Sequence, residues 1–265
     1  MPMSATAPEL LATVERSPQA VAVHDRAAWV GLFAADARVE DPVGSRAHVG
    51  TAAVERFYDT FIAPNGIAFD IEHDVVCGMT VYRDLAIETT MSTGVTLRVP
   101  MHLRYDVVRT GGDLKIRQLH AHWELPVMIG QLLGAGVPGL GAAVKLAPQL
   151  LGNQGVGGAL GFARGFVRVG AAGRRAAIGL LEAAGRGDGA AVRAALAADA
   201  GVYWAGTPIG IEGFVARTGG LEVGKTIAAG RFVTATVDTP TGRGIAEAEV
   251  ARGGKITALQ VYIAE

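Results

Sequence analysis

The stretch of sequence that decides the fold is residues 25–39, DRAAWVGLFAADARV. Asp25 is a favoured helix N-cap, and apolar residues follow it at helical spacing before the chain reaches Ala34-Ala35-Asp36-Ala37. The same pattern returns at residues 188–202, DGAAVRAALAADAGV, at a constant offset of 163 and with an identical Ala-Ala-Asp-Ala core. A pattern that repeats at such a distance indicates two copies of one domain.

The ends of the two copies also correspond. Lys115-Ile116 and Lys255-Ile256 each follow a Gly-Gly turn, so we interpret residues 1–125 and 171–265 as two versions of one domain. In the first copy, helical patterns precede segments with strand alternation or β-branched residues, namely Ile71–Val76, Ala86–Met91, Leu97–Val108 and Leu114–Trp123. This order predicts an α+β domain with helices on one face of a curved antiparallel sheet.

Composition excludes several classes of protein. The 265 residues include 24 Lys+Arg and 25 Asp+Glu, so no surplus of charge favours nucleic acid. Half of the residues are hydrophobic and the mean hydropathy is +0.31, which is too apolar for a disordered chain. Cys77 is the only cysteine, so an internal disulfide and a Cys-based zinc site are both excluded. The first residues do not resemble a secretion signal, and we expect a cytoplasmic protein.

An apolar connector, residues 126–170, separates the two copies. From Leu125 to Ala163 the only charged residue is Lys145. The prolines and glycines in this segment favour short helices over a transmembrane span. We expect these helices to cover the mouth of a pocket or the groove between the copies. Peripheral contact with a membrane surface is the less favoured alternative, because the segment lacks a basic polar face.

A short acidic phrase carries the strongest functional signal. In Val39-Glu40-Asp41-Pro42-Val43-Gly44-Ser45 the Asp-Pro pair on its own is typical of a plain turn. Together with Gly50–Val54 and Phe57-Tyr58, however, the phrase resembles the bacterial Δ5-3-ketosteroid isomerases of the nuclear-transport-factor-2-like (NTF2-like, SnoaL-like) superfamily, over residues of about 14–124. The resemblance implies a cone-shaped domain, a hydrophobic ligand such as a steroid, no cofactor, and Asp41 as the general base.

The resemblance extends to Asp106-Val107-Val108-Arg109, whose distance from Trp123 matches the family without a gap. It implies that Asp106 is the protonated acid of an oxyanion hole, that Tyr58 lies near this network, and that the substrate contacts a wall made of Trp123, Phe57, Phe33, Leu119 and His102. Such an enzyme moves a double bond into conjugation with a ketone by proton transfer. The reaction needs an ionised base together with donors that stabilise the negative oxygen.

Two departures from the family pattern favour other functions. Ser17 stands where the family has a donor tyrosine, and Ser17-Pro18 is also typical of a helix start, which would interrupt the first helix. Strand alternation places Arg104 on the face of Asp106, where a guanidinium favours the ionised carboxylate. The alternatives are a non-catalytic protein that binds a steroid, lipid or polyketide, and another reaction of the same fold such as cyclisation or epoxide opening.

The remaining signals are weaker. His120 and His122 form a His-x-His pair without a recognisable third ligand, so we predict no metal site. His102 is either a donor near Asp106 or a structural histidine. In the second copy, Trp204 aligns with Asp41, and Ala246 or Ala248 aligns with Asp106. We therefore expect a degenerate second domain that acts as an intramolecular pseudo-dimer partner or within a homodimer.

Overall fold

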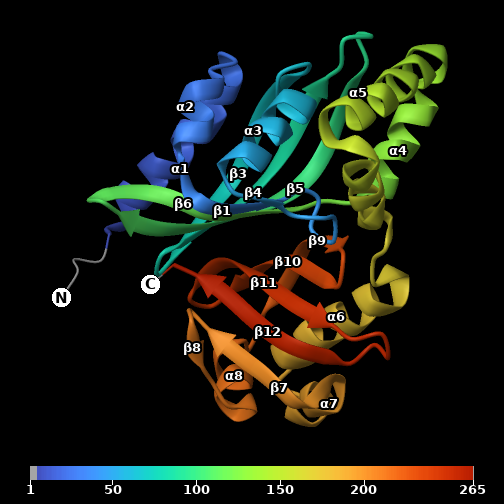
Figure 1. Ribbon diagram of the computed structural model, residues 1–265. Helices are drawn as coiled ribbons and strands as arrows, with labels where there is room; N and C mark the ends of the chain where they lie inside the picture. Colours follow the sequence, from blue (N-terminus) through green and yellow to red (C-terminus); the bar gives the residue numbers. More distant parts are fainter. Residues whose placement is uncertain (1–4, 265) are drawn as a thin grey trace. The chain divides into compact units, whose positions relative to one another are not determined.

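The computed structural model describes residues 5–264, apart from the side chains of several residues between 138 and 159, Lys145 among them. It divides into two compact units. The first comprises the residues up to Val167 except Asp74–Gly78, and the second comprises Asp74–Gly78 together with the residues from Arg168 onward. Each unit holds a six-stranded sheet with helices (Figure 1). The predicted α+β class with two domains is confirmed, but each sheet is mixed and not purely antiparallel, because its first and last strands in the sequence pair in parallel.

Before the connector, the first unit begins with helices and continues into long strands, as its sequence predicts. Its sheet has the order β2-β1-β6-β5-β4-β3, in which β1 and β6 are parallel and the other neighbours that the register records are antiparallel. The elements before the connector are α1 (Ala7–Ala22), α2 (Arg26–Gly31), β1 (Phe33–Glu40), β2 (His48–Val49), α3 (Thr51–Phe57), the π-helical turn η1 (Tyr58–Ile62), β3 (Gly66–Cys77), β4 (Thr80–Thr90), β5 (Thr96–Thr110) and β6 (Asp113–His122).

Helix α1 is continuous through Ser17-Pro18, so the predicted helix start at Ser17 is wrong. The helix begins instead at Ala7 and is capped by Thr6. The Thr6 hydroxyl accepts a hydrogen bond from the backbone N–H of Glu9, while the Glu9 carboxylate accepts one from the N–H of Thr6. This reciprocal cap satisfies two backbone donors that the first turn leaves open. Pro18 lies near the C-terminal end of α1, and Ser17 is consequently buried on the interior face of the helix.

The second unit repeats this topology. Its sheet has the order β8-β7-β12-β11-β10-β9, with one parallel pair, β7 and β12. Its elements are α6 (Gly170–Gly185), α7 (Gly189–Ala195), β7 (Leu196–Trp204), β8 (Thr207–Pro208), α8 (Ile211–Arg217), β9 (Glu222–Ala229), β10 (Phe232–Thr239), β11 (Gly242–Val250) and β12 (Ile256–Ile263). The Ala-Ala-Asp-Ala core of the sequence repeat lies in β1 and in β7, where each strand begins beside its parallel partner.

Equivalent contacts hold the short helices that precede β1 and β7. Asp25 accepts a hydrogen bond from the N–H of Ala28 at 2.8 Å, and Asp188 accepts one from the N–H of Ala191 at 2.9 Å. At the other end, the Lys115 ammonium donates to the carbonyl of Gly31, and the Lys255 ammonium donates to that of Ala194. A cation at a helix C-terminus and an acid at its N-terminus both complement the helix dipole.

These caps give a matched pair of stability predictions. Asp25→Ala and Asp188→Ala each remove the side-chain acceptor at a helix N-terminus, and each is expected to destabilise its own domain by about 1 kcal/mol. Chemical denaturation of the full chain with each variant tests this expectation. An Asp→Asn variant at the same position, which keeps the acceptor oxygen, is the control. An Asp25→Ala variant as stable as the parent would show that this cap contributes nothing.

The connector forms α4 (Leu125–Gly134), α5 (Gly136–Ala163) and a short 3-10 turn, η2 (Arg164–Phe166). These elements fall within the first unit. Figure 1 shows α4 and α5 running beside each other next to β5. Within the part of the chain that the structure describes, none of the helices is long and apolar enough to span a bilayer.

Candidate active site

An apolar cavity of about 150 Å³ lies between the first sheet and the helices α1–α3. Every second residue of β5 faces this cavity, namely Val99, Met101, Leu103 and Tyr105. Both connector helices contribute to its wall, through Met128 of α4 and Phe162 of α5. The expectation that the connector covers a pocket therefore has direct structural support within the first unit.

Asp41 is the carboxylate of this cavity. It follows the last residue of β1, and Trp123 follows the last residue of β6 by one position. Because β1 and β6 are parallel neighbours, their C-terminal ends meet at the same edge of the sheet. The indole Nε1 of Trp123 donates to Oδ1 of Asp41 at 2.5 Å. The turn after Asp41 is fixed by Glu40, whose carboxylate accepts from the N–H of Gly44 at 2.8 Å.

Burial among apolar side chains raises the pKa of Asp41 to about 6, against an ordinary value of 3.8. The hydrogen bond from Trp123 acts in the opposite sense, because it stabilises the ionised carboxylate. At neutral pH the group is thus largely ionised, yet it accepts a proton more readily than an ordinary aspartate. These are the properties of a general base.

The predicted wall residues fall into two groups. Trp123, Phe57 and Leu119 line the cavity with Asp41, whereas Phe33, Tyr58 and His102 do not. Phe33 packs against Trp29, with ring centroids 4.6 Å apart. Tyr58 is buried, and its hydroxyl has no hydrogen-bond partner among the described residues. Tyr58 is therefore a core residue next to the cavity and not a group that reaches into it.

Asp106 does not lie in the cavity, contrary to the sequence-based expectation. Arg104 donates to both of its carboxylate oxygens at 3.0 Å, and the Thr80 hydroxyl donates to Oδ1 at 2.8 Å. The pairing of β5 with β6 is regular from His102 to Asp106. Alternation therefore places Asp106 on the face opposite Tyr105. An ion-paired carboxylate on that face is not placed to donate a hydrogen bond to a ligand in the cavity.

The same alternation explains His102. It is fully buried, with Nε2 at 3.4 Å from Oδ1 of Asp84, and its ring makes an edge contact with Tyr82. Of the two roles that the sequence leaves open for His102, the structure therefore supports that of a structural histidine. No group of three or more His, Cys, Asp or Glu residues with metal-binding geometry occurs among the described residues.

Three residues with hydroxyl groups line the cavity that were not predicted as site residues, namely Ser17, Thr89 and Tyr105. Tyr105 occupies the face that Asp106 was expected to occupy. Ser17, at the position of the family tyrosine, accepts a hydrogen bond from Trp29 Nε1 at 3.1 Å. A hydroxyl that accepts from an indole keeps its own O–H as a donor, and the incoming hydrogen bond polarises that O–H. Strand alternation could have identified Tyr105, but no sequence signal identified Trp29 as the partner of Ser17.

The placement of Asp106 makes a specific prediction. Asp106→Asn is expected to cost about 1 kcal/mol of stability, because a partly exposed ion pair is lost, while kcat/KM of any reaction in the cavity changes less than twofold. The Arg104→Met/Asp106→Asn double variant should recover part of the loss, since it leaves no unpaired charge. Thermal melts and steady-state kinetics of the two variants check this. A large loss of kcat/KM in a stably folded Asp106→Asn protein would contradict the assignment.

The second unit has no equivalent of this carboxylate. Trp204 stands at the position of Asp41 and is buried beside Phe214, with ring centroids 6.5 Å apart. The guanidinium of Arg217 lies over the Trp204 ring, 5.9 Å from its centroid. The positions aligned with Asp106, Ala246 and Ala248, are buried in the apolar core of this unit. Asp41 and its neighbours in the first unit therefore form the candidate site.

Comparison with known proteins identifies the first domain. Residues 14–118 match the family model of the SnoaL-like domain. Three similar solved structures are the following, each covering about half of this chain. A Δ5-3-ketosteroid isomerase from Mycobacterium sp. is 28% identical (TM-score 0.41, 47% of this chain and 96% of that chain). A Mycobacterium tuberculosis protein in complex with estradiol-17β-hemisuccinate is 26% identical (TM-score 0.41, covering 47% of this chain and 97% of that chain). An epoxide hydrolase/cyclase-like enzyme of pyran ring formation in the polyether salinomycin is 21% identical (TM-score 0.41, covering 45% of this chain and 93% of that chain). Residues 14–118 are a SnoaL-like domain of the NTF2-like superfamily.

Proposed function

We propose that the first domain is a cofactor-independent isomerase that moves a double bond by proton transfer in a steroid or a similarly large apolar ketone. The observation that carries this proposal is Asp41, a carboxylate with a pKa of about 6 in the wall of an apolar cavity. A base with a pKa near the working pH both ionises and transfers its proton efficiently.

Each group in the cavity has a distinct role in the proposed reaction. Asp41 removes a proton from the carbon next to the carbonyl group, which generates a dienolate, and returns the proton to the far end of the conjugated system. Trp123 holds the carboxylate in place through the bond to Oδ1. The hydroxyls of Ser17 and Tyr105 supply the donors for the enolate oxygen, replacing the family tyrosine and the acid that Asp106 does not provide.

The pH dependence of turnover tests the proposal. With a Δ5-3-ketosteroid as the probe, formation of the conjugated enone is followed spectroscopically. Because the base must be ionised, kcat/KM should rise with pH through a limb near 6 and remain level above it. Trp123→Phe removes the donor that favours the ionised carboxylate and should move the limb to higher pH. A profile without a limb between pH 4 and 8, or the absence of enone formation, would contradict the proposal.

The second candidate function is binding of a hydrophobic ligand without chemistry. It is favoured by the position of Asp106, which leaves the cavity without the second acid of the family pattern. The two functions differ in their response to an enolate mimic. An isomerase should bind a phenolic steroid more tightly than the corresponding substrate ketone, because the phenol resembles the charged intermediate. A binding protein should show no such preference.

A further inference from the structure

A second cavity of about 610 Å³ adjoins the apolar one and has a different chemistry. Four guanidinium groups line it, from Arg38 of β1, Arg46, Arg56 of α3 and Arg164 of η2, and the imidazole of His48 lies among them. We name it the arginine cavity. Its lining residues all belong to the first unit. Among the described residues that line it, none is an aspartate or a glutamate.

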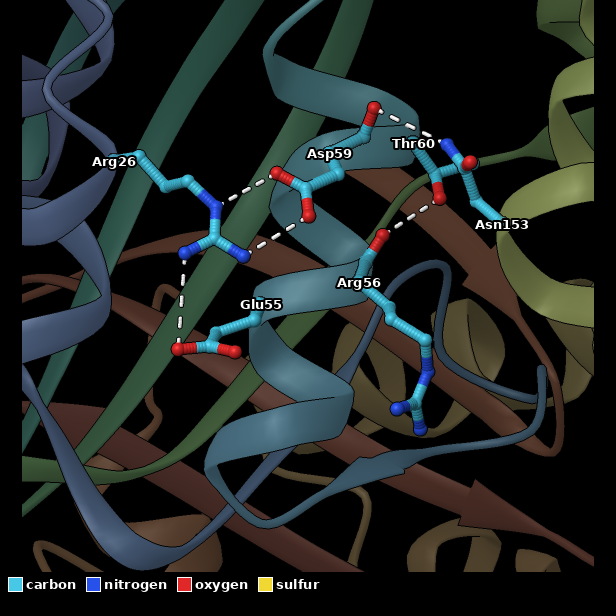
Figure 2. Close-up of polar contacts among 6 residues, drawn as sticks. All are labelled: Arg26, Glu55, Arg56, Asp59, Thr60 and Asn153. Carbon is cyan, nitrogen blue, oxygen red and sulfur yellow. Dashed lines mark hydrogen bonds and ion pairs between the residues drawn. The ribbon is translucent and has the colours of Figure 1, made fainter.

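The acidic residues that neighbour these arginines in the sequence make contacts of their own. Glu40 contacts Arg38 at 3.2 Å and also accepts from the backbone of Gly44. Arg26 of α2 binds Asp59 of η1 through two hydrogen bonds of 2.7 and 3.0 Å and lies 3.7 Å from Glu55 of α3. Figure 2 shows that the side chain of Arg56 extends away from these two carboxylates. Because its described lining holds four arginines and no carboxylate, the arginine cavity is positively charged.

The position of Arg46 is built into the fold. Its backbone N–H donates to the carbonyl of Gly161 at 3.0 Å, and its aliphatic stem packs on the bare Cα of the same residue. A Cβ at Gly161 would lie 2.6 Å from the Cβ of Arg46, so a larger residue would displace the arginine. Burial and the guanidinium groups of Arg56 and Arg46 also lower the pKa of His48 to about 4. At neutral pH this imidazole is uncharged and can donate one hydrogen bond.

Two aromatic rings connect the arginine cavity to the apolar cavity. Phe61 and Phe162 line both of them. The rings stack on each other, with centroids 5.4 Å apart and planes inclined by 27°. An apolar molecule seated beside Asp41 and a charged group among the arginines would thus lie on either side of one pair of side chains. A single ligand that passes this ring pair can occupy both cavities.

We propose that the arginine cavity binds a phosphate-type oxyanion, phosphate or diphosphate, carried by the same ligand whose apolar body occupies the cavity of Asp41. Several forked guanidinium groups match the geometry and the multiple negative charge of a phosphate ester. A single carboxylate would need only one such fork. The inference rests on the proposed function in one respect, since it takes the apolar cavity as the seat of the ligand body.

Calorimetry on the full chain with three probes tests the inference: estradiol, estradiol 17-phosphate and inorganic pyrophosphate. The phosphate ester should bind at least tenfold more tightly than estradiol, and its affinity should fall as salt is added. The Arg46→Met/Arg164→Met double variant should lose most of this gain while its affinity for estradiol changes less than twofold. Arg46→Lys keeps the charge without the fork and should lose part of it. Arg16→Met, at an exposed position of α1, is the control for a change in net charge.

The outcomes separate this inference from the proposed function. Equal affinity for estradiol and its phosphate, or a gain that survives in the double variant, overturns the inference and leaves the isomerase proposal standing. Binding of pyrophosphate without binding of either steroid would contradict both the claim that one ligand occupies the two cavities and the isomerase proposal. A phosphate ester whose gain depends on Arg46 and Arg164 supports the inference, even where no turnover of a ketosteroid is observed. Circular dichroism melts establish that each variant is folded.

Discussion

Replacement of Asp41 by Asn is expected to reduce kcat for an accepted ketone about 10²–10⁴-fold, the range for a lost acid–base group. The variant keeps the volume of the side chain and an oxygen that accepts from Trp123, so binding of the substrate should change little. Steady-state kinetics and calorimetry on the same preparation measure the two quantities separately. Wild-type turnover in the variant would remove Asp41 from the mechanism.

The same substitution has a measurable effect on stability, and its sign is fixed. Because the pKa of Asp41 is raised in the folded protein, the folded state binds a proton more strongly than the unfolded chain between pH 4 and 6. The cost of burying the ionised carboxylate is therefore complete above pH 6 and absent below pH 4. Because the Asp41 residue is intermediate in exposure, water screens part of this cost. Asp41→Asn should therefore stabilise the first domain by about 1–2 kcal/mol at pH 8. At pH 4 the two proteins should be equally stable.

Trp29→Ala is expected to cause the largest loss of stability, about 3–5 kcal/mol. Trp29 is 2% exposed, and its ring lies 4.6 Å from Phe33, 5.6 Å from Tyr58 and 6.0 Å from Phe57. Truncation empties the space between these rings and also removes the hydrogen bond to Ser17. Against a typical stability of about 5–15 kcal/mol, this loss is a large share of the total. Chemical denaturation monitored by circular dichroism measures it.

Trp29→Phe is the matched control, because it keeps an aromatic ring and removes the indole N–H. It should cost much less than Trp29→Ala, with about 1 kcal/mol arising from the lost hydrogen bond. If Ser17 donates to the enolate oxygen as proposed, Trp29→Phe should also lower kcat, since the Ser17 hydroxyl is no longer polarised. Equal destabilisation by the two variants would show that packing of the ring is not the dominant contribution.

Most of the fold could be predicted from the sequence because it depends on patterns that repeat. The Ala-Ala-Asp-Ala core at an offset of 163 predicts two copies, and both copies have the same strand order. Local detail was less accessible. The helical spacing that begins at Ala27 continues to Phe33 and leads into Ala34–Val39, but the helix ends at Gly31 and the strand begins at Phe33. Partners distant in sequence decide this boundary, since Phe33 pairs with Ile116 of β6.

The candidate site was predictable in part, for a physical reason that Asp106 illustrates. Asp41 and Trp123 follow the ends of two neighbouring strands, so both lie at one edge of the sheet and line the same cavity whichever way the pleat runs. Asp106 lies in the middle of a strand, where a displacement by one residue exchanges the two faces of the sheet. A match of spacing to Trp123 cannot decide between the faces, and Tyr105 occupies the side that Asp106 was expected to occupy.

The indole of Trp204 has a consequence for how a tandem chain can evolve. A carboxylate in an apolar wall is a burden on stability that only useful chemistry justifies, whereas a buried indole at the same position adds packing. In a chain with two copies of the domain, one copy can lose the destabilising carboxylate while the other copy keeps it. The trade-off between robustness and reactivity that a single-domain ancestor must accept within one core is then divided between two cores.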